Sequence, residues 1–238
     1  MASVGDQDYL RAVERGDLRT AGKMVAAAAK EFGFCVGPVF HGTRSEFTEF
    51  RQSSDPERFN IGFHFGSKVQ AKYRVFGDGE DQGDGVLISA YLKGNFVEFT
   101  DLGGFEPHAV ADSLLKKGWM RKSDVLSVYR ATRKVETAND LRVIYERHIY
   151  PAFQKYGYTG ISYENEIEGP GKSYAVFSPD QIRLATPVAY DDLGQPIPLS
   201  RRFAPGSNDI RGVLVEEMPG PPAPGQQLSN PPFTAHLR

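Results

Sequence analysis

Apolar residues follow helical spacing near the N-terminus and again in the middle of the chain, with short apolar runs between these stretches. Residues 6–32 are expected to form a helical hairpin, because Gly16-Asp17 interrupts an amphipathic pattern. Asp8 is placed to cap the first helix and Asp17 to cap the second. The same spacing predicts further helices over 107–117, 122–132 and 137–156.

Short runs of β-branched and aromatic residues, bounded by glycine and polar residues, predict strands. A helix that carries Tyr73 is expected to begin at Ser67, and the acidic glycine-rich stretch 77–85 is expected to be a solvated loop rather than a calcium site. This mixture of elements favours an α+β fold. The predicted strands cover residues 36–41, 63–65, 86–92, 159–163 and 173–177.

The chain changes character after Leu184. Residues 187–238 contain ten prolines, and their apolar residues are scattered without a period. Segments of this composition generally bury too little apolar surface to offset the entropy lost on folding. We therefore expect an extended, largely disordered tail over 187–238, with Val213-Leu214-Val215 as a docking patch for a partner.

The bulk composition is that of a globular protein. The 238 residues are 40% hydrophobic, which allows one sizeable core or two small ones. A net charge of -2 gives no general attraction to nucleic acid or acidic membranes, although it leaves room for a local basic groove. The one cysteine, Cys35, excludes an intramolecular disulfide and a multi-cysteine zinc site, and its apolar neighbours predict that it is buried.

Targeting and metal signals are absent from the sequence. The N-terminus lacks the basic and apolar regions of a secretory signal, and no apolar run is long enough to span a bilayer. We therefore expect the protein to act in a cytoplasm, of its producer or of a target cell, with no membrane partner. Asp101, Glu106 and His108 fit no known ligand spacing, so no metal is expected.

Three motifs carry candidate chemistry: His41-Gly42-Thr43, Gly62–Ser67, and Tyr163–Gly169 with the following Ser173–Phe177. Cleavage of NAD at the nicotinamide–ribose bond needs a flat site for the carboxamide, polar partners for the ribose and a carboxylate beside the developing positive charge. In this order, the motifs resemble the NAD-binding core of ADP-ribosyltransferases. The resemblance is to the diphtheria-toxin and poly(ADP-ribose)-polymerase branch, and most closely to small transferase domains of phage and mobile-element polyproteins.

The resemblance implies a split, two-sheet α+β core with NAD in the cleft between the sheets. This catalytic domain would cover 36–186, after the helical lead-in of 1–35 and before the tail. His41 would bind a ribose hydroxyl, and the backbone of Gly42 would pair with the carboxamide, with Thr43 beside it. His64 takes the position of the family's catalytic tyrosine.

The remaining roles that the resemblance implies fall on an aromatic ring, a hydroxyl and a carboxylate. Tyr73 matches the tyrosine that stacks on the nicotinamide ring, and Ser173 falls among the residues that bind NAD. Glu168 matches the catalytic glutamate. Glu164 and Glu166 are neighbours that could substitute for it, since alternate side chains of a strand share one face.

The resemblance implies a mono-ADP-ribosyltransferase that cleaves NAD as its substrate and transfers ADP-ribose to an unidentified protein or nucleic-acid acceptor, as a toxin or effector would. Two alternatives remain open from the residues. On the same fold, water could be the acceptor, which would make the protein an NAD glycohydrolase. A protein with a degenerate catalytic triad could instead be a non-catalytic module that binds NAD or a partner.

Overall fold

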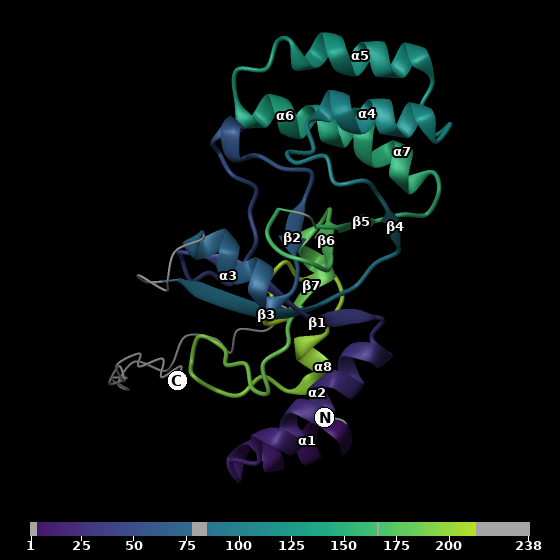
Figure 1. Ribbon diagram of the computed structural model, residues 1–238. Coiled ribbons are helices and arrows are strands. Elements are labelled where there is room, and N and C mark those ends of the chain that lie inside the picture. The colour runs from purple at the N-terminus through teal and green to yellow at the C-terminus, as the bar shows by residue number, and fades with distance from the viewer. Residues whose placement is uncertain (1–3, 78–84, 166, 213–238) are drawn as a thin grey trace, which may run out of the picture.

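The computed structural model describes residues 4–77, 85–165 and 167–212. Its helices and strands form three tiers (Figure 1), with α4–α7 at the top, the strands and α3 in the middle, and α1, α2 and α8 at the bottom. The mixture of helices and two sheets confirms the predicted α+β class. Most of the predicted acidic loop, one candidate glutamate and the predicted docking patch lie outside the described residues: 78–84, Glu166 and Val213–Val215.

Two N-terminal helices pack against each other below the sheets. They are α1 (Val4–Glu14) and α2 (Leu18–Glu31). Asp17 caps α2 as expected, since its carboxylate accepts the backbone N–H of Thr20 at 3.0 Å. Asp8 does not cap α1, because that helix begins four residues earlier. Cys35, which was expected to be buried, is exposed in the extended segment after α2; its neighbour Phe34 fills the core instead.

The strands form two sheets. The first has the order β1-β3-β7 and is antiparallel, and the second has the order β2-β6-β5-β4, with β4 and β5 as its parallel pair. A bridge between Phe40 and Gly66 connects the sheets, with backbone hydrogen bonds of 2.8 and 2.9 Å. The strands are β1 (Val36–Thr43), β2 (Phe63–Phe65), β3 (Val86–Leu92), β4 (Phe96–Glu98), β5 (Gly160–Glu164), β6 (Lys172–Val176) and β7 (Ile182–Leu184).

A helical layer covers the second sheet (Figure 1) and supplies most of its buried apolar contacts. Its helices are α4 (Pro107–Lys116), α5 (Lys122–Thr132), α6 (Ala138–Ile144) and α7 (Tyr150–Gln154). The predicted helix 137–156 is one continuous stretch, but Tyr145–Ile149 adopts π-helical bonding between α6 and α7. Pro151 explains the change, because a proline has no N–H to donate to the carbonyl four residues earlier.

The stretch 187–212 differs from the expected disordered tail. It includes α8 (Leu199–Arg202), and Leu199 and Phe203 are buried against α1 and α2. The guanidinium of Arg202 is buried as well and donates to the backbone oxygens of Leu184 and Thr186 at 2.9 and 2.8 Å. Hydrogen bonds and single apolar contacts hold this segment, so it has no periodicity by which the sequence could reveal it.

Two further short elements position the site. A 3₁₀ turn, η1 (Pro56–Arg58), lies in the segment between β1 and β2, and α3 (Lys68–Phe76) follows β2. The side chain of Ser67 accepts the backbone N–H of Gln70, which begins α3 with a capping box. Among the described residues, no helix has both the length and the apolar character that a bilayer span requires.

Candidate active site

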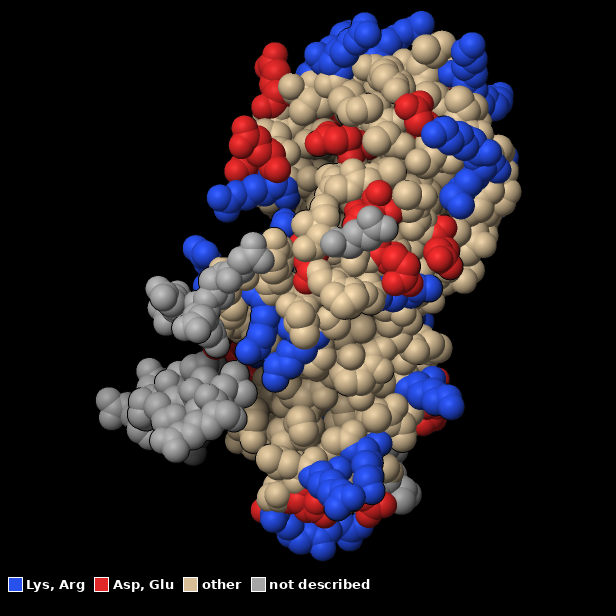
Figure 2. Space-filling view, in the orientation of Figure 1, with Lys and Arg blue, Asp and Glu red and all other residues tan. Residues whose placement is uncertain are grey.

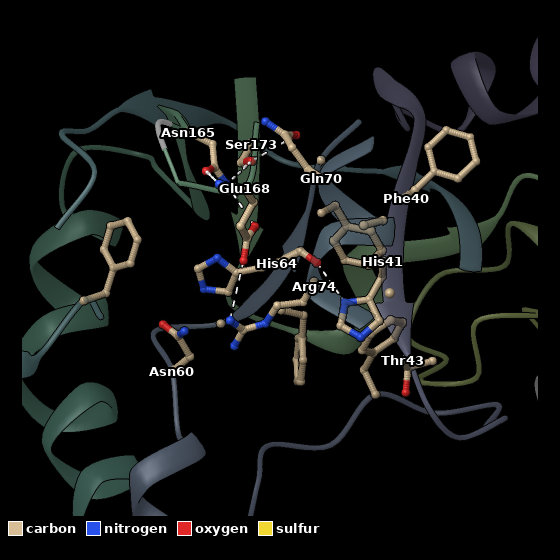
Figure 3. Close-up of a pocket in the computed structure, with 18 of the residues that line it drawn as sticks. Phe40, His41, Thr43, Asn60, His64, Gln70, Arg74, Asn165, Glu168 and Ser173 are labelled. Carbon is tan, nitrogen blue, oxygen red and sulfur yellow. Dashed lines mark hydrogen bonds and ion pairs between the residues drawn. The ribbon is translucent and has the colours of Figure 1, made fainter. Parts of the chain in front are cut away.

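A cavity of about 600 Å³ opens between the two sheets. Residues of β1 line it on one side, and residues of β2 and the β5–β6 connection line it on the other. The segment 44–60 and α3 close two further sides. Figure 3 shows that the labelled polar side chains from these elements converge on one space.

The two ring nitrogens of His41 have different roles. Nδ1 lies 2.8 Å from the backbone oxygen of His64, and because a carbonyl can only accept, Nδ1 carries the proton. Burial lowers the pKa of His41 by more than this hydrogen bond raises it, so the ring is neutral near pH 7. Phe50 and Phe65 fix the ring, with centroids 4.9 and 5.5 Å away. Nε2 is therefore an oriented hydrogen-bond acceptor.

His64 enters the same cavity from β2. Its Nδ1 is 2.8 Å from the hydroxyl of Tyr163 on β5. Burial, followed by the charges of Arg74 and His41, lowers the pKa of His64 to about 3, so this ring is also neutral. Nε2 is buried and has no hydrogen-bond partner among the described residues. Buried polar atoms are nearly always paired, so this unpaired nitrogen is an unusual feature of the site.

The low pKa of His64 also makes folding sensitive to acid. An unfolded chain protonates histidine near a pH of about 6.5. Between that pH and about 3, the unfolded chain binds a proton that the folded protein does not. The stability that depends on neutral His64 is therefore complete above about pH 6.5 and is lost progressively as the pH falls.

Glu168 brings a carboxylate into the cavity from the β5–β6 connection. Oε2 accepts a hydrogen bond of 3.0 Å from Nδ2 of Asn165, and Oε1 lies 3.5 Å from Nη1 of Arg74 on α3. The side chain of Glu168 is 24% exposed, whereas that of Arg74 is 71% exposed. One oxygen of the carboxylate is therefore held by a buried amide, and the other faces an exposed cation at the cavity.

Asn165 is the residue that shapes this connection. It is 5% exposed, and its Oδ1 accepts the backbone N–H groups of Ile167 and Glu168 at 3.1 and 2.9 Å. Its Nδ2 donates to Glu168 and also to Oγ of Ser173 at 3.2 Å. One side chain therefore sets both the turn of the backbone and the direction of the carboxylate.

Gln70 ties the same connection to α3. Its Nε2 donates to the backbone oxygens of Gly169 and Gly171 at 2.8 and 2.9 Å, and its Oε1 accepts from Oγ of Ser173 at 3.4 Å. Gln70 and Ser173 are both buried. Ser173, which was expected to bind NAD, lines the cavity and is also a link in the network that supports Glu168. Its contact with NAD stays a prediction.

Gly42 and Thr43 lie at the cavity beside His41. A Cβ atom at Gly42 would lie only 2.0 Å from the backbone oxygen of Ala71 on α3, so no other residue allows β1 and α3 to pack this closely. The hydroxyl of Thr43 accepts the backbone N–H of Ser45 at 3.2 Å and so fixes the turn that follows β1.

Tyr73 is not among the residues that line the cavity, so its expected stacking role stays a prediction. The helical phase of α3 explains its position, because successive residues turn by about 100°. Gln70, Ala71 and Arg74 face the cavity, and Tyr73 points well away from their common direction. The aromatic rings at the cavity are phenylalanines and a tyrosine from other elements: Phe47, Phe50, Phe65, Phe105 and Tyr163.

Glu164 and Glu168 do not share one strand face. Glu164 is the last residue of β5, is exposed, and pairs in register with Lys172 outside the cavity. Glu168 lies beyond the strand, in the connection. Glu166 lies outside the described residues. Of the two glutamates that the structure describes here, only Glu168 lines the cavity.

A protein-family model described as "ADP-Ribosyltransferase in polyvalent proteins" matches residues 37–189. The chain belongs to this ADP-ribosyltransferase family. The match contains every residue that lines the cavity, and ADP-ribosyltransferases use NAD as their substrate. No curated protein and no solved structure matches the chain.

Several polar residues of this ADP-ribosyltransferase cavity were not predicted from the sequence. Arg74 and Gln70 could have been found from the phase of α3 once Ala71 was placed inward. Asn60 and Asp101 lie in irregular segments, and nothing local marks them as cavity residues. Within the described part of the chain, no group of three or more histidine, cysteine or acidic side chains is arranged to hold a metal ion.

Proposed function

We propose that this chain is a mono-ADP-ribosyltransferase that cleaves NAD at the nicotinamide–ribose bond and transfers ADP-ribose to a macromolecular acceptor. One observation carries the proposal: the carboxylate of Glu168 is held by Asn165 in the same cavity as the neutral rings of His41 and His64. His41 lies on β1, His64 on β2 and Glu168 in the connection between β5 and β6.

The ribose is bound through His41. Its Nε2 is the free acceptor of a neutral ring whose Nδ1–H is already committed to the carbonyl of His64. A sugar hydroxyl donates to such a nitrogen without any change in protonation.

The nicotinamide carboxamide is bound by the backbone of Gly42. Phe40 directs its N–H and C=O toward Gly66 in the bridge between the sheets. Backbone groups two residues apart in a strand point to the same side. Gly42 therefore directs its own N–H and C=O toward the second sheet, two residues beyond the bridge at Phe40. A planar amide can pair with both groups there.

The carboxylate of Glu168 stabilises the reaction's transition state. As the bond between ribose C1′ and the nicotinamide nitrogen breaks, its electron pair goes to the nitrogen, and positive charge develops on the ribose. A fixed carboxylate beside that charge lowers the barrier. The acceptor's nucleophile then bonds to C1′, and its proton passes to the carboxylate or to solvent.

The test uses the full chain with NAD labelled in the adenosine part. We expect release of nicotinamide, and mass spectrometry of a treated cell extract should find added ADP-ribose on protein or nucleic acid. Release without any transfer would identify an NAD glycohydrolase. Failure to bind NAD in calorimetry, with no release, would refute the proposal and favour a non-catalytic module that binds a partner.

A further inference from the structure

The helix pair α4–α5 carries a charge opposite to that of the whole chain. Residues 107–134 contain seven lysines and arginines against two aspartates, whereas the chain has a net charge of -2. Both aspartates are engaged locally: Asp112 accepts the hydroxyl of Tyr129 at 2.6 Å, and Asp124 pairs with Arg121 at 3.1 Å. The excess positive charge is therefore not neutralised within the pair.

A groove of about 360 Å³ runs along the seam between these two helices. Three of its cations are exposed and form no ion pair with any described residue: Lys122 at one end, and Arg130 and Arg133 toward the other. Lys122 begins α5 and Arg133 directly follows its last residue, so the two are eleven positions and about 16 Å apart along the helix. Figure 2 shows lysine and arginine side chains over this top tier of the molecule.

The floor of the groove is mostly apolar, and Asp112, whose carboxylate accepts from Tyr129, is the acidic residue among those that line it. Leu115 of α4 and Leu126 of α5 are 36% and 47% exposed, and Val125 and Tyr129 lie between the cations. A partner that fits this groove must combine negative charges with flat or apolar groups over a short distance. A partner that bound through charge alone would leave the two exposed leucines at the centre of this cationic surface unexplained.

We propose that the α4–α5 groove binds single-stranded nucleic acid. Phosphates of a single strand would pair with Lys122, Arg130 and Arg133, and unstacked bases would pack against Leu126 and Tyr129. Positively charged grooves with aromatic and apolar floors bind single strands in this way. A duplex would bring phosphates without accessible base faces and would leave the apolar floor uncovered. The proposal concerns binding and does not depend on the reaction in the cavity.

The test measures fluorescence anisotropy of labelled oligo(dT) of twenty nucleotides with the full chain at several salt concentrations. We expect binding that weakens with salt. Each phosphate contact to a single strand contributes about 0.7 to the slope of log K against log salt. Replacement of Lys122, Arg130 and Arg133 by glutamine should reduce the slope by about 2 and the affinity at least tenfold. The Leu126→Gln variant should lose affinity with an unchanged slope.

The matched control replaces Arg19, Lys23 and Lys30 by glutamine, which removes the same charge from exposed positions of α2 at the opposite end of the molecule. This variant should bind as the wild type does, and circular dichroism should show that all variants are folded. Equal losses in both triple variants would refute the groove. Equal affinity for a duplex would also refute the proposal. Competition by polyglutamate as strong as that by unlabelled oligo(dT) would refute it too, and would favour an acidic protein as the partner.

Discussion

Replacement of Glu168 by glutamine separates substrate binding from chemistry. The substitution keeps the size of the side chain and an oxygen that can accept from Asn165, which holds Glu168 at 3.0 Å. The ion pair with Arg74 is lost, but the two atoms are 3.5 Å apart and Arg74 is 71% exposed. Exposed pairs of this kind contribute about 0 to 1 kcal/mol. The variant should therefore fold and melt within a few degrees of the wild type.

The effect on the reaction should be much larger. Loss of one preorganised electrostatic contact to a developing charge typically costs about a hundredfold in rate, or about 2.7 kcal/mol of barrier. Affinity for NAD should change little, because the proposed ribose and carboxamide contacts come from His41 and Gly42. Nicotinamide release measures the rate, and calorimetry measures the binding.

Glu164→Gln is the matched control, because it makes the same change at the exposed end of β5, outside the cavity. It should keep the wild-type rate. If the Glu164 variant is inactive and the Glu168 variant is active, the proposed catalytic carboxylate is wrong. If both keep the wild-type rate, the positive charge is stabilised by some other group and the reasoning from Asn165 and Glu168 fails.

Three other substitutions test separate parts of the structure. His41→Ala should weaken NAD affinity and turnover together, since the ring is proposed to hold the ribose throughout; unchanged affinity in calorimetry would exclude that contact. Between pH 6.5 and 4.5, the wild type should lose about 2.3 kcal/mol more unfolding free energy than His64→Gln; urea titrations at each pH measure this, and parallel losses would contradict it. Arg202→Met removes buried hydrogen bonds to Leu184 and Thr186 and should cost about 3 kcal/mol, or about 6 to 12 °C in Tm by calorimetry; an unchanged Tm would show that the segment 187–212 contributes little.

The sequence could predict most elements of the top and middle tiers because their signals are local. The helices over 107–117 and 122–132 and the strands over 63–65 and 86–92 lie within one residue of the observed elements. Periodicity and caps are properties of neighbouring residues, so they can be recognised in the sequence without tertiary information. The elements β4 and α8 span only three and four residues and carry no period. The strand β2 is as short as β4, but Gly62 and Gly66 on either side mark it in the sequence.

The site shows the same division. Local motifs singled out His41, His64 and Glu168, because their residue types and flanking glycines are visible in the chain. Only the tertiary structure placed them together, through the bridge between Phe40 and Gly66 that joins the two sheets. It also decided that Arg74 and not Tyr73 faces the cavity, since the phase of a helix is fixed by what it packs against.

The sequence by itself determined the α+β class, the order of most elements and the family resemblance that a match over 37–189 now supports. The tertiary structure decided which polar groups are desolvated and which are paired. The neutral state of His64, the hold of Gln70 on the β5–β6 connection and the burial of Arg202 all depend on residues far apart in the chain. Burial and pairing are properties of the folded surface, and no local pattern encodes them.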